Sequence, residues 1–220
     1  YESGEPHDTY YVYDQYGNLT YVIPPLAADP FGTAVTESIL DGLCYQYKYD
    51  YRNRLIEKKL PGKQWEYMVY DKLDRVVGTG PAYNPFDGQT VGWNVTRYDA
   101  FGRVVYTGWR PASGEFSSSE RLAYQTDYDN AAYLNEERQA ADNTLDGVAL
   151  RYSAQVLPDG GFKLLTYNYY DNYDFTGAPT FPLTIVEQTA QQNVKGMATA
   201  TWTRALTADT QTEGDFTYML

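Results

Sequence analysis

The chain has 220 residues and a formal net charge of -12 at pH 7. A chain this acidic is repelled by a phosphate backbone and by an anionic lipid surface, so we expect neither nucleic acid nor a membrane as its partner. No apolar run approaches the ~20 residues that a membrane-spanning helix needs. The length is sufficient to bury a core without metal or disulfide support.

The composition favours strands and turns over helices. Aromatic residues make up 16% of the chain, with 24 tyrosines among them, and there are 18 glycines and 11 prolines. The one cysteine, Cys44, cannot form an internal disulfide and is expected to be a small buried residue. The chain opens on Tyr1 without a visible signal peptide, so we expect it to be a piece of a longer protein.

A short pattern, Tyr-Asp-x-x-[Gly/Asn/Asp]-[Arg/Asn]-[Leu/Val], is written four times along the chain, starting at Tyr13, Tyr49, Tyr70 and Tyr98. A fifth, degenerate copy starts at Tyr170. The signature residues are Tyr13, Asp14, Gly17, Tyr49, Asp50, Asn53, Arg54, Tyr70, Asp71, Asp74, Arg75, Tyr98, Asp99, Gly102, Arg103, Tyr170 and Asp171.

The pattern predicts a β-hairpin at each copy. Aspartate is favoured at the start of a type I turn, and Gly, Asn or Asp three residues later tolerates the left-handed conformation of a G1 bulge. Asp174 holds that place in the fifth copy. Tyr45, Tyr47 and Tyr49 alternate with polar residues and should share one face, with their rings packed in the core. The positions just after the turn are expected to point inward: Leu19, Leu55, Val76 and Val104.

Two helices and one further hairpin are expected between the repeats. Apolar residues at helical spacing predict a helix near residues 33–42, and the capping box Ser117-Ser118-Ser119-Glu120 predicts a helix to about Gln125. Residues 151–156 and 162–167 flank Pro-Asp-Gly-Gly and predict a hairpin. The expected fold is therefore mainly β, an antiparallel sheet of repeated hairpins with one or two short helices in insertions.

Three regions follow from these elements. Residues 1–110 carry the repeat hairpins, 111–165 form an insertion rather than an independent domain, and 166–220 hold degenerate repeats. Phe216-Thr217-Tyr218-Met219-Leu220 parallels Trp65-Glu66-Tyr67-Met68-Val69, which precedes Tyr70-Asp71, so we expect the sequence to stop just before another Tyr-Asp.

The chemistry of an enzyme is hard to place on this chain. His7 is the one histidine, near the N-terminus, so Ser-His-Asp and Cys-His arrangements have no interior base, and no phosphate-binding glycine loop occurs. Acidic neighbours such as Asp127 with Asp129, Asp171 with Asp174, and Glu136 with Glu137 leave glycoside hydrolysis as a weak alternative. Oxygen ligands at Asp127, Asp129 and Asn130 allow a calcium site, but the number of ligands there favours a solvated acidic loop. We expect no enzyme activity, no metal and no cofactor.

Tyr-Asp at intervals of ~20 residues, followed by a Gly-Arg-Leu or Gly-Arg-Val type of segment, resembles the YD repeats of secreted bacterial Rhs-type proteins, over residues 10 to 110. The resemblance implies a non-catalytic slice of a spiral β-sheet shell, secreted or on the cell surface, that encloses a C-terminal passenger, often a toxin. No segment matches the self-cleaving core of that family. The acidity suggests a basic passenger. The alternative is a module that binds surface glycans through rows of exposed aromatic rings.

Overall fold

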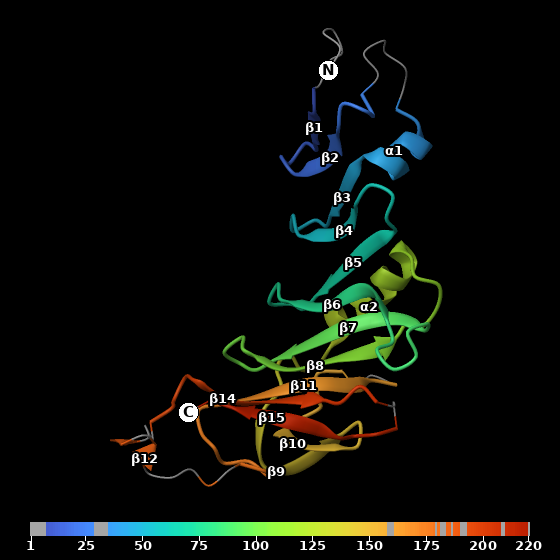
Figure 1. Ribbon diagram of the computed structural model, residues 1–220. Coiled ribbons are helices and arrows are strands. Elements are labelled where there is room, and N and C mark those ends of the chain that lie inside the picture. The colour runs from blue at the N-terminus through green and yellow to red at the C-terminus, as the bar shows by residue number, and fades with distance from the viewer. Residues whose placement is uncertain are drawn as a thin grey trace.

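The computed structural model describes residues 8–28, 35–157, 161–178, 180, 184–185, 187–189, 193–207 and 210–219. Its main feature is an antiparallel sheet of 11 strands in the order β1-β2-β3-β4-β5-β6-β7-β8-β11-β14-β15. Figure 1 shows this sheet as a long twisted strip, with β1 at one end and β15 towards the other. The predicted mainly β architecture of consecutive antiparallel hairpins is confirmed.

The strands and helices are short segments separated by turns and loops. The strands of the large sheet are β1 (Tyr10–Tyr13), β2 (Leu19–Ile23), β3 (Tyr45–Tyr49), β4 (Leu55–Lys59), β5 (Trp65–Tyr70), β6 (Val76–Tyr83), β7 (Val91–Tyr98), β8 (Val104–Pro111), β11 (Lys163–Tyr170), β14 (Ala198–Arg204) and β15 (Gly214–Tyr218). Two pairs lie outside it, β9 (Arg138–Leu145) with β10 (Val148–Tyr152) and β12 (Thr184–Ile185) with β13 (Gln188–Thr189). The helices are α1 (Glu37–Leu43) and α2 (Ser118–Asn130).

The four predicted repeat turns form with the expected backbone. The left-handed residues are Gly17, Asn53, Asp74 and Gly102, with φ angles of 85°, 58°, 62° and 77°. The amide of each donates to the carbonyl of the turn aspartate at 3.0–3.1 Å, which closes a type I turn before a G1 bulge. All four turns project from the same side of the strip (Figure 1).

A second irregularity after these turns changes which residues are buried. Val77 has no partner in β5, because β5 pairs with the residues on either side of it, and Val105 lies in the same position opposite β7. These two valines are 2% and 0% exposed. The inward positions predicted at Leu19, Leu55, Val76 and Val104 are only partly buried. That prediction is wrong: in the third and fourth copies the register shift moves the buried position one residue further along, whereas in the first two copies the next residues, Thr20 and Ile56, are also only partly buried.

The core lies on one face of the strip, beneath α2 and the β9–β10 hairpin. Tyr124 and Tyr128 of α2 are 2% and 1% exposed, and the ring of Tyr124 lies 5.2 Å from that of Trp93 on β7. Further along, Tyr152 of β10 stacks on Tyr169 of β11 at 5.6 Å. Offset and tilted ring pairs of this kind stabilise beyond the area that they bury.

The tyrosines of β3 lie on the opposite face. Tyr45 is 38% exposed, whereas its neighbour Gln46 is 7% exposed and donates to the carboxylate of Asp41 at 3.1 Å. Burial does not alternate along β3: Gln46 is buried, but Lys48 on the same face is exposed, and Tyr47 and Tyr49 are partly buried. The prediction that these rings pack in the core is wrong for Tyr45 and for Tyr13, and the latter is 58% exposed.

Both helices begin at the caps that their sequences provide. Thr36 caps α1 by accepting from the Ile39 amide at 3.4 Å, so this helix starts and ends later than the predicted 33–42, of which residues 33–34 lie outside the described residues. Ser117 caps α2 by accepting from the Glu120 amide at 3.3 Å. This helix continues to Asn130, past the predicted end at Gln125, because Tyr128, one turn after Tyr124, is also buried against the core.

The hairpin predicted from residues 151–156 and 162–167 is wrong. β10 pairs with β9 through a turn at Asp146 and Gly147, both with positive φ, as in the type I′ turns of two-residue hairpins. β11 instead joins the large sheet between β8 and β14. The chain therefore leaves the strip after β8 and returns to the same edge at β11.

The fifth copy of the pattern does not form a tight hairpin. The residue with positive φ is Asp171, at 73°, and not Asp174. The Asp171 amide donates to the Met197 carbonyl at 3.0 Å, and its carboxylate accepts from the Gly196 amide at 2.6 Å. Tyr170 and Asp171 thus keep their place at a strand end, but the turn is closed by residues that lie far along the chain.

Close packing between β7 and β8 predicts that Gly92 does not tolerate a side chain. A Cβ at this position would lie 2.0 Å from the Arg110 carbonyl oxygen and 2.6 Å from Cζ2 of Trp109. We expect Gly92→Ala to lower the free energy of unfolding by about 3 kcal/mol, measured by urea denaturation. Gly114→Ala is the control, since no heavy atom lies within 4 Å of its Cβ. Equal stability of the two variants would contradict this packing.

Candidate functional site

Each arginine-containing repeat turn organises its own charged pair. In the third copy, Asp71 accepts from the Leu73 and Arg75 amides through Oδ1 and from Nε of Arg75 through Oδ2, at 2.9, 3.0 and 2.7 Å. The second and fourth copies repeat this arrangement at Asp50 with Arg54 and at Asp99 with Arg103. The turn thereby fixes the guanidinium at one side of the strip.

The same guanidiniums bind the next hairpin. Arg54 Nη1 donates to the Asp71 carbonyl at 3.4 Å, and Arg75 Nη1 donates to the Asp99 carbonyl at 3.1 Å. Arg103 forms a bidentate pair with the carboxylate of Asp171, at 3.1 and 2.9 Å. The signature arginine of one copy therefore donates hydrogen bonds to the signature aspartate of the following copy, at its main-chain carbonyl or at its carboxylate.

The signature tyrosine of the following copy completes each contact. The guanidinium carbons of Arg54, Arg75 and Arg103 lie 4.6, 4.8 and 4.3 Å from the ring centres of Tyr70, Tyr98 and Tyr170. The three tyrosine hydroxyls donate back to the carbonyls of Leu55, Val76 and Val104, at 2.7, 2.7 and 2.8 Å. We call these repeated contacts the turn ladder. The fifth copy, although it forms no tight hairpin, contributes a full Tyr-Asp step to it.

The first step of the ladder is weaker because it lacks arginine. Asn18 occupies the arginine position, and its amide donates to Asp14 and to Asn53 of the next turn, both at 3.0 Å. β2 and β3 pair at only two positions, compared with three between β4 and β5. The N-terminal hairpin is therefore the least firmly attached part of the described ladder.

The environment of the ladder keeps its groups in the forms that these contacts need. Burial alone would raise the pKa of Asp50, but hydrogen bonds from the Arg54 amide and guanidinium outweigh burial and lower it. The hydrogen bond from Arg103 lowers the pKa of Asp171, and the pKa of Arg103 is raised in turn. Burial raises the pKa of Tyr70, so its hydroxyl stays a neutral donor.

Part of the insertion is bound to the same turns, which the sequence did not predict. The Leu134 carbonyl accepts from Nη2 of Arg75 at 2.7 Å, and the Ala131 carbonyl accepts from Nζ of Lys72 at 3.0 Å. The Glu136 amide donates to the Tyr98 carbonyl at 2.8 Å. Main-chain acceptors carry no signature in the sequence, so no residue pattern could have identified this contact.

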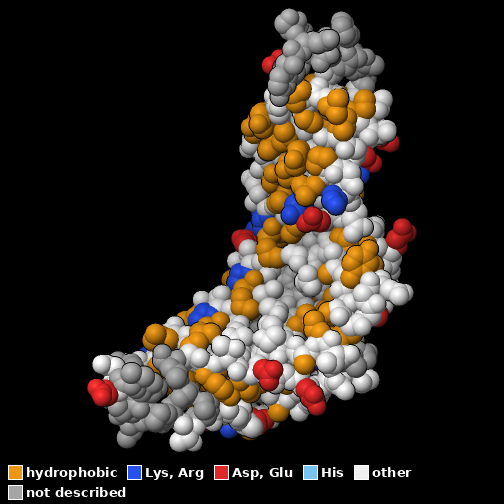
Figure 2. Space-filling model, viewed as in Figure 1, with side chains coloured by type: hydrophobic (Ala, Val, Ile, Leu, Met, Phe, Trp, Pro, Cys, Tyr) orange, Lys and Arg blue, Asp and Glu red, His pale blue; other side chains and the backbone are white. Residues whose placement is uncertain are grey.

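The face of the strip opposite the core contains a groove of about 490 Å³ beside β5 and β6. Met68, Thr79 and Asn94 lie in register across three strands of its floor, and Lys58 pairs with Glu66 at 2.9 Å along one side. Over β1 to β4 this face carries exposed aromatic rings, and Figure 2 shows hydrophobic side chains gathered there.

The acidic residues considered for catalysis or calcium lie apart from the ladder or are already bound. Asp127 and Asp129 are exposed on the last turns of α2, and Asp129 accepts from Gln125 at 3.0 Å. Glu136 is 2% exposed and accepts from hydroxyls and amides around it, including Ser153 Oγ at 2.5 Å. The described residues contain no cluster of three or more potential metal ligands. Neither described helix is long and apolar enough to cross a membrane.

Loss of a ladder arginine is expected to destabilise the sheet. Arg103→Ala removes a bidentate pair and a stacked cation, and it leaves Asp99 and Asp171 without this donor. We expect a loss of about 2–3 kcal/mol in the free energy of unfolding, measured by chemical denaturation. Arg103→Lys should lose an intermediate amount, because an ammonium group cannot bind both oxygens in a fork.

The matched control for Arg103 is Arg52, which lies at a turn tip and pairs with Asp74 at 2.8 Å while 39% of its side chain is exposed. Arg52→Ala should cost about 0.5 kcal/mol or less, since exposed ion pairs contribute little. A similar loss in the two alanine variants would contradict the ladder as the source of stability.

The weak first step predicts a stabilising substitution. Arginine in place of Asn18 has the same position relative to Tyr49 that Arg54 has relative to Tyr70. A cation stacked on a ring contributes about 0.5–1 kcal/mol, so Asn18→Arg should slow amide hydrogen exchange in β1 and β2 about threefold. Unchanged or faster exchange would show that the arginine position is not what holds successive hairpins.

The ladder also predicts acid sensitivity. The pKa of Asp50 and of Asp171 is lower in the folded chain than the usual 3.8, so their stabilisation is present above that value and is lost as the pH falls through the folded values. The urea midpoint should therefore fall from about pH 5 downward, and the fall should be smaller in Asp50→Asn. An equal pH dependence in that variant would be inconsistent with this assignment.

Comparison with known proteins does not extend this description. No protein-family model matches the chain, and no curated protein matches its sequence.

Proposed function

We propose that this chain is a non-enzymatic structural segment of a large Rhs-type protein, in which it forms part of a β-sheet shell around a C-terminal passenger. The observation that carries the proposal is the turn ladder. Each arginine-bearing hairpin provides the cation and the carbonyl that the next tyrosine and aspartate bind. A wall built in this way grows by repetition of one contact, as a container made from a single chain requires.

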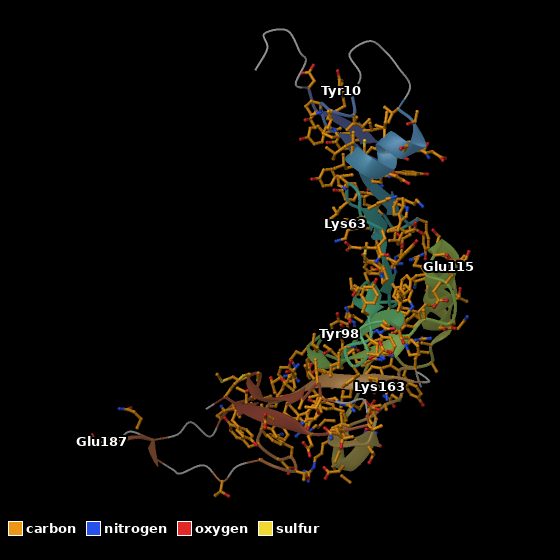
Figure 3. All side chains as sticks on the ribbon, turned by 45° about the vertical axis from the view of Figure 1, so that its right-hand side comes forward. Tyr10, Lys63, Tyr98, Glu115, Lys163 and Glu187 are labelled. Carbon is orange, nitrogen blue, oxygen red and sulfur yellow. The ribbon has the colours of Figure 1, made fainter. Side chains whose placement is uncertain are left out.

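The shape of the strip also supports a wall. Figure 3 shows the sheet curving as an arc, with α2, which follows Glu115, on its convex side. The core cluster that includes Tyr124 and Tyr152 lies on the face that α2 and the β9–β10 hairpin cover. The concave face of the described strip carries no helix, so it is the face that we assign to the interior.

The charge of the chain suits a basic passenger. With a net charge of -12, the wall attracts cationic surfaces and repels nucleic acid. We place the protein outside the producing cell, secreted or on the surface, on the basis of the resemblance of its Tyr-Asp repeats alone. The passenger and the rest of the parent chain are its proposed partners, without a cofactor.

A second candidate is a module that binds surface glycans. It is favoured by the exposed rings on the first strands, where Tyr10, Tyr11 and Tyr45 are 52%, 59% and 38% exposed. Rings with a free face can stack on the apolar faces of sugars. Under this function, Tyr11→Ala would abolish binding to a glycan array and leave the melting temperature unchanged.

The shell proposal is tested on the parent protein by limited proteolysis followed by mass spectrometry. We expect the C-terminal region to resist digestion, and to lose that resistance in the double variant Arg75→Ala and Arg103→Ala. The physical reason is that a wall with two open ladder steps admits the protease to its contents.

Arg52→Ala in the parent protein is the matched control, since Arg52 pairs with Asp74 at a turn tip but contacts no following tyrosine in the described chain. It should leave the C-terminal region resistant. Rapid digestion of that region in the unmodified parent would exclude a closed container and make glycan binding the leading account.

A further inference from the structure

Two signature tyrosines of the described chain have no arginine stacked on them: Tyr49, whose preceding copy has Asn18 at the arginine position, and Tyr13. Tyr70, Tyr98 and Tyr170 are partly buried beneath the guanidinium of the preceding copy. Tyr13 is 58% exposed, and no arginine of the described chain stacks on it. Its ring is the same element of the pattern, in the same position at the end of a first hairpin strand.

The strand that carries Tyr13 is also the first strand at one edge of the described sheet. β1 pairs with β2 alone within the described chain, and all four of its residues are exposed. An edge strand presents unpaired N–H and C=O groups that can add a further strand. Tyr11, two residues before Tyr13, is 59% exposed on the same face. The ring of Tyr13 and the edge of β1 together form a surface like the one that β5 and Tyr70 present to β4 and Arg54.

The internal steps define what this surface accepts. In each complete step, the second strand of one hairpin pairs with the first strand of the following unit: β4 with β5, β6 with β7, and β8 with β11. The approaching strand always follows an arginine that comes directly after the left-handed turn residue. Because all three interfaces have this form, the partner that we expect at β1 is a hairpin with an arginine in the same position.

We propose that the β1 edge with Tyr13 is a binding site for a β-hairpin that carries an arginine directly after its left-handed turn residue. The guanidinium stacks on the ring of Tyr13 and donates to the Asp14 carbonyl, as Arg54 does to Asp71. The Tyr13 hydroxyl donates to the carbonyl of the residue after that arginine, as Tyr70 does to Leu55. The site rests on the ladder geometry and does not depend on the shell proposal.

The test uses a probe taken from this chain. A head-to-tail cyclised peptide of residues 45–59, which holds the β3–β4 hairpin and Arg54, is titrated into the isotope-labelled full chain, and amide shifts are followed by NMR. Cyclisation is needed because a lone hairpin is marginally stable in water. We expect saturable shifts in β1, and at least tenfold weaker binding of the same peptide with Arg54→Ala.

Variants of the protein locate the site. Tyr13→Ala should weaken binding at least tenfold, and Tyr13→Phe, which keeps the ring and loses the hydroxyl, should weaken it less. Tyr16→Ala is the matched control, because Tyr16 is an exposed tyrosine of the same turn at 72% and has no ladder position. The Tyr13→Phe variant keeps the test valid if Tyr13→Ala disturbs the hairpin.

Three results would overturn the inference. They are no saturable shift in β1 with the unmodified peptide, equal binding of the peptide that lacks Arg54, and equal binding by the Tyr13 variants. Self-association of the chain that persists in Tyr13→Ala would likewise assign the edge to another contact. Failure here leaves the proteolysis result on the parent protein unaffected, so the two proposals can fail separately.

Discussion

The guanidinium groups at the turns are the constraint on which the sheet depends. Arg75, for example, is bound by its own aspartate, by the main chain of the next hairpin and by the ring of Tyr98. An isolated hairpin is only marginally stable in water. The arginine at its turn adds stability only when a second hairpin provides the ring and the carbonyl that it contacts. The ladder makes the stability of each turn conditional on its neighbour, which is how short and separately weak units form one sheet.

The two faces of the strip then take different roles. One face is closed by aromatic packing, with Tyr124 and Tyr128 of α2 against the middle strands and Tyr152 of β10 against the later ones. The other keeps polar rows such as Thr79 and Asn94 in register and exposed rings on the first strands. Rigidity thus comes from the covered face and from the turns, which leaves the uncovered face available for contact with another molecule.

The sequence predicted the features that depend on local geometry. Gly102 and Asn53 identified the left-handed turn position, because few residues tolerate that conformation. The same reasoning failed at Asp174, because the turn after Tyr170 is closed by Gly196 and Met197, which no local pattern connects to it. The sequence also did not predict the second role of the arginines. Their contacts with the next copy join residues far apart in the chain, and the sequence of neither turn differs from that of a turn without such a contact.

The link between Arg103 and Asp171 shows how loosely the ladder constrains the chain between its steps. Its two ends are 68 positions apart in the sequence, whereas Arg54 and Asp71 are 17 apart. Arg54 reaches the main-chain carbonyl of Asp71 and Arg103 the carboxylate of Asp171, yet both guanidiniums stack on the tyrosine of the next copy. Only the strand ends must meet, so the intervening segment is free to lengthen, as it does through α2 and the β9–β10 hairpin. A protein of this construction can therefore acquire whole new elements between two strands while its sheet stays continuous, and the inserted elements can change in sequence without altering the contacts between successive turns.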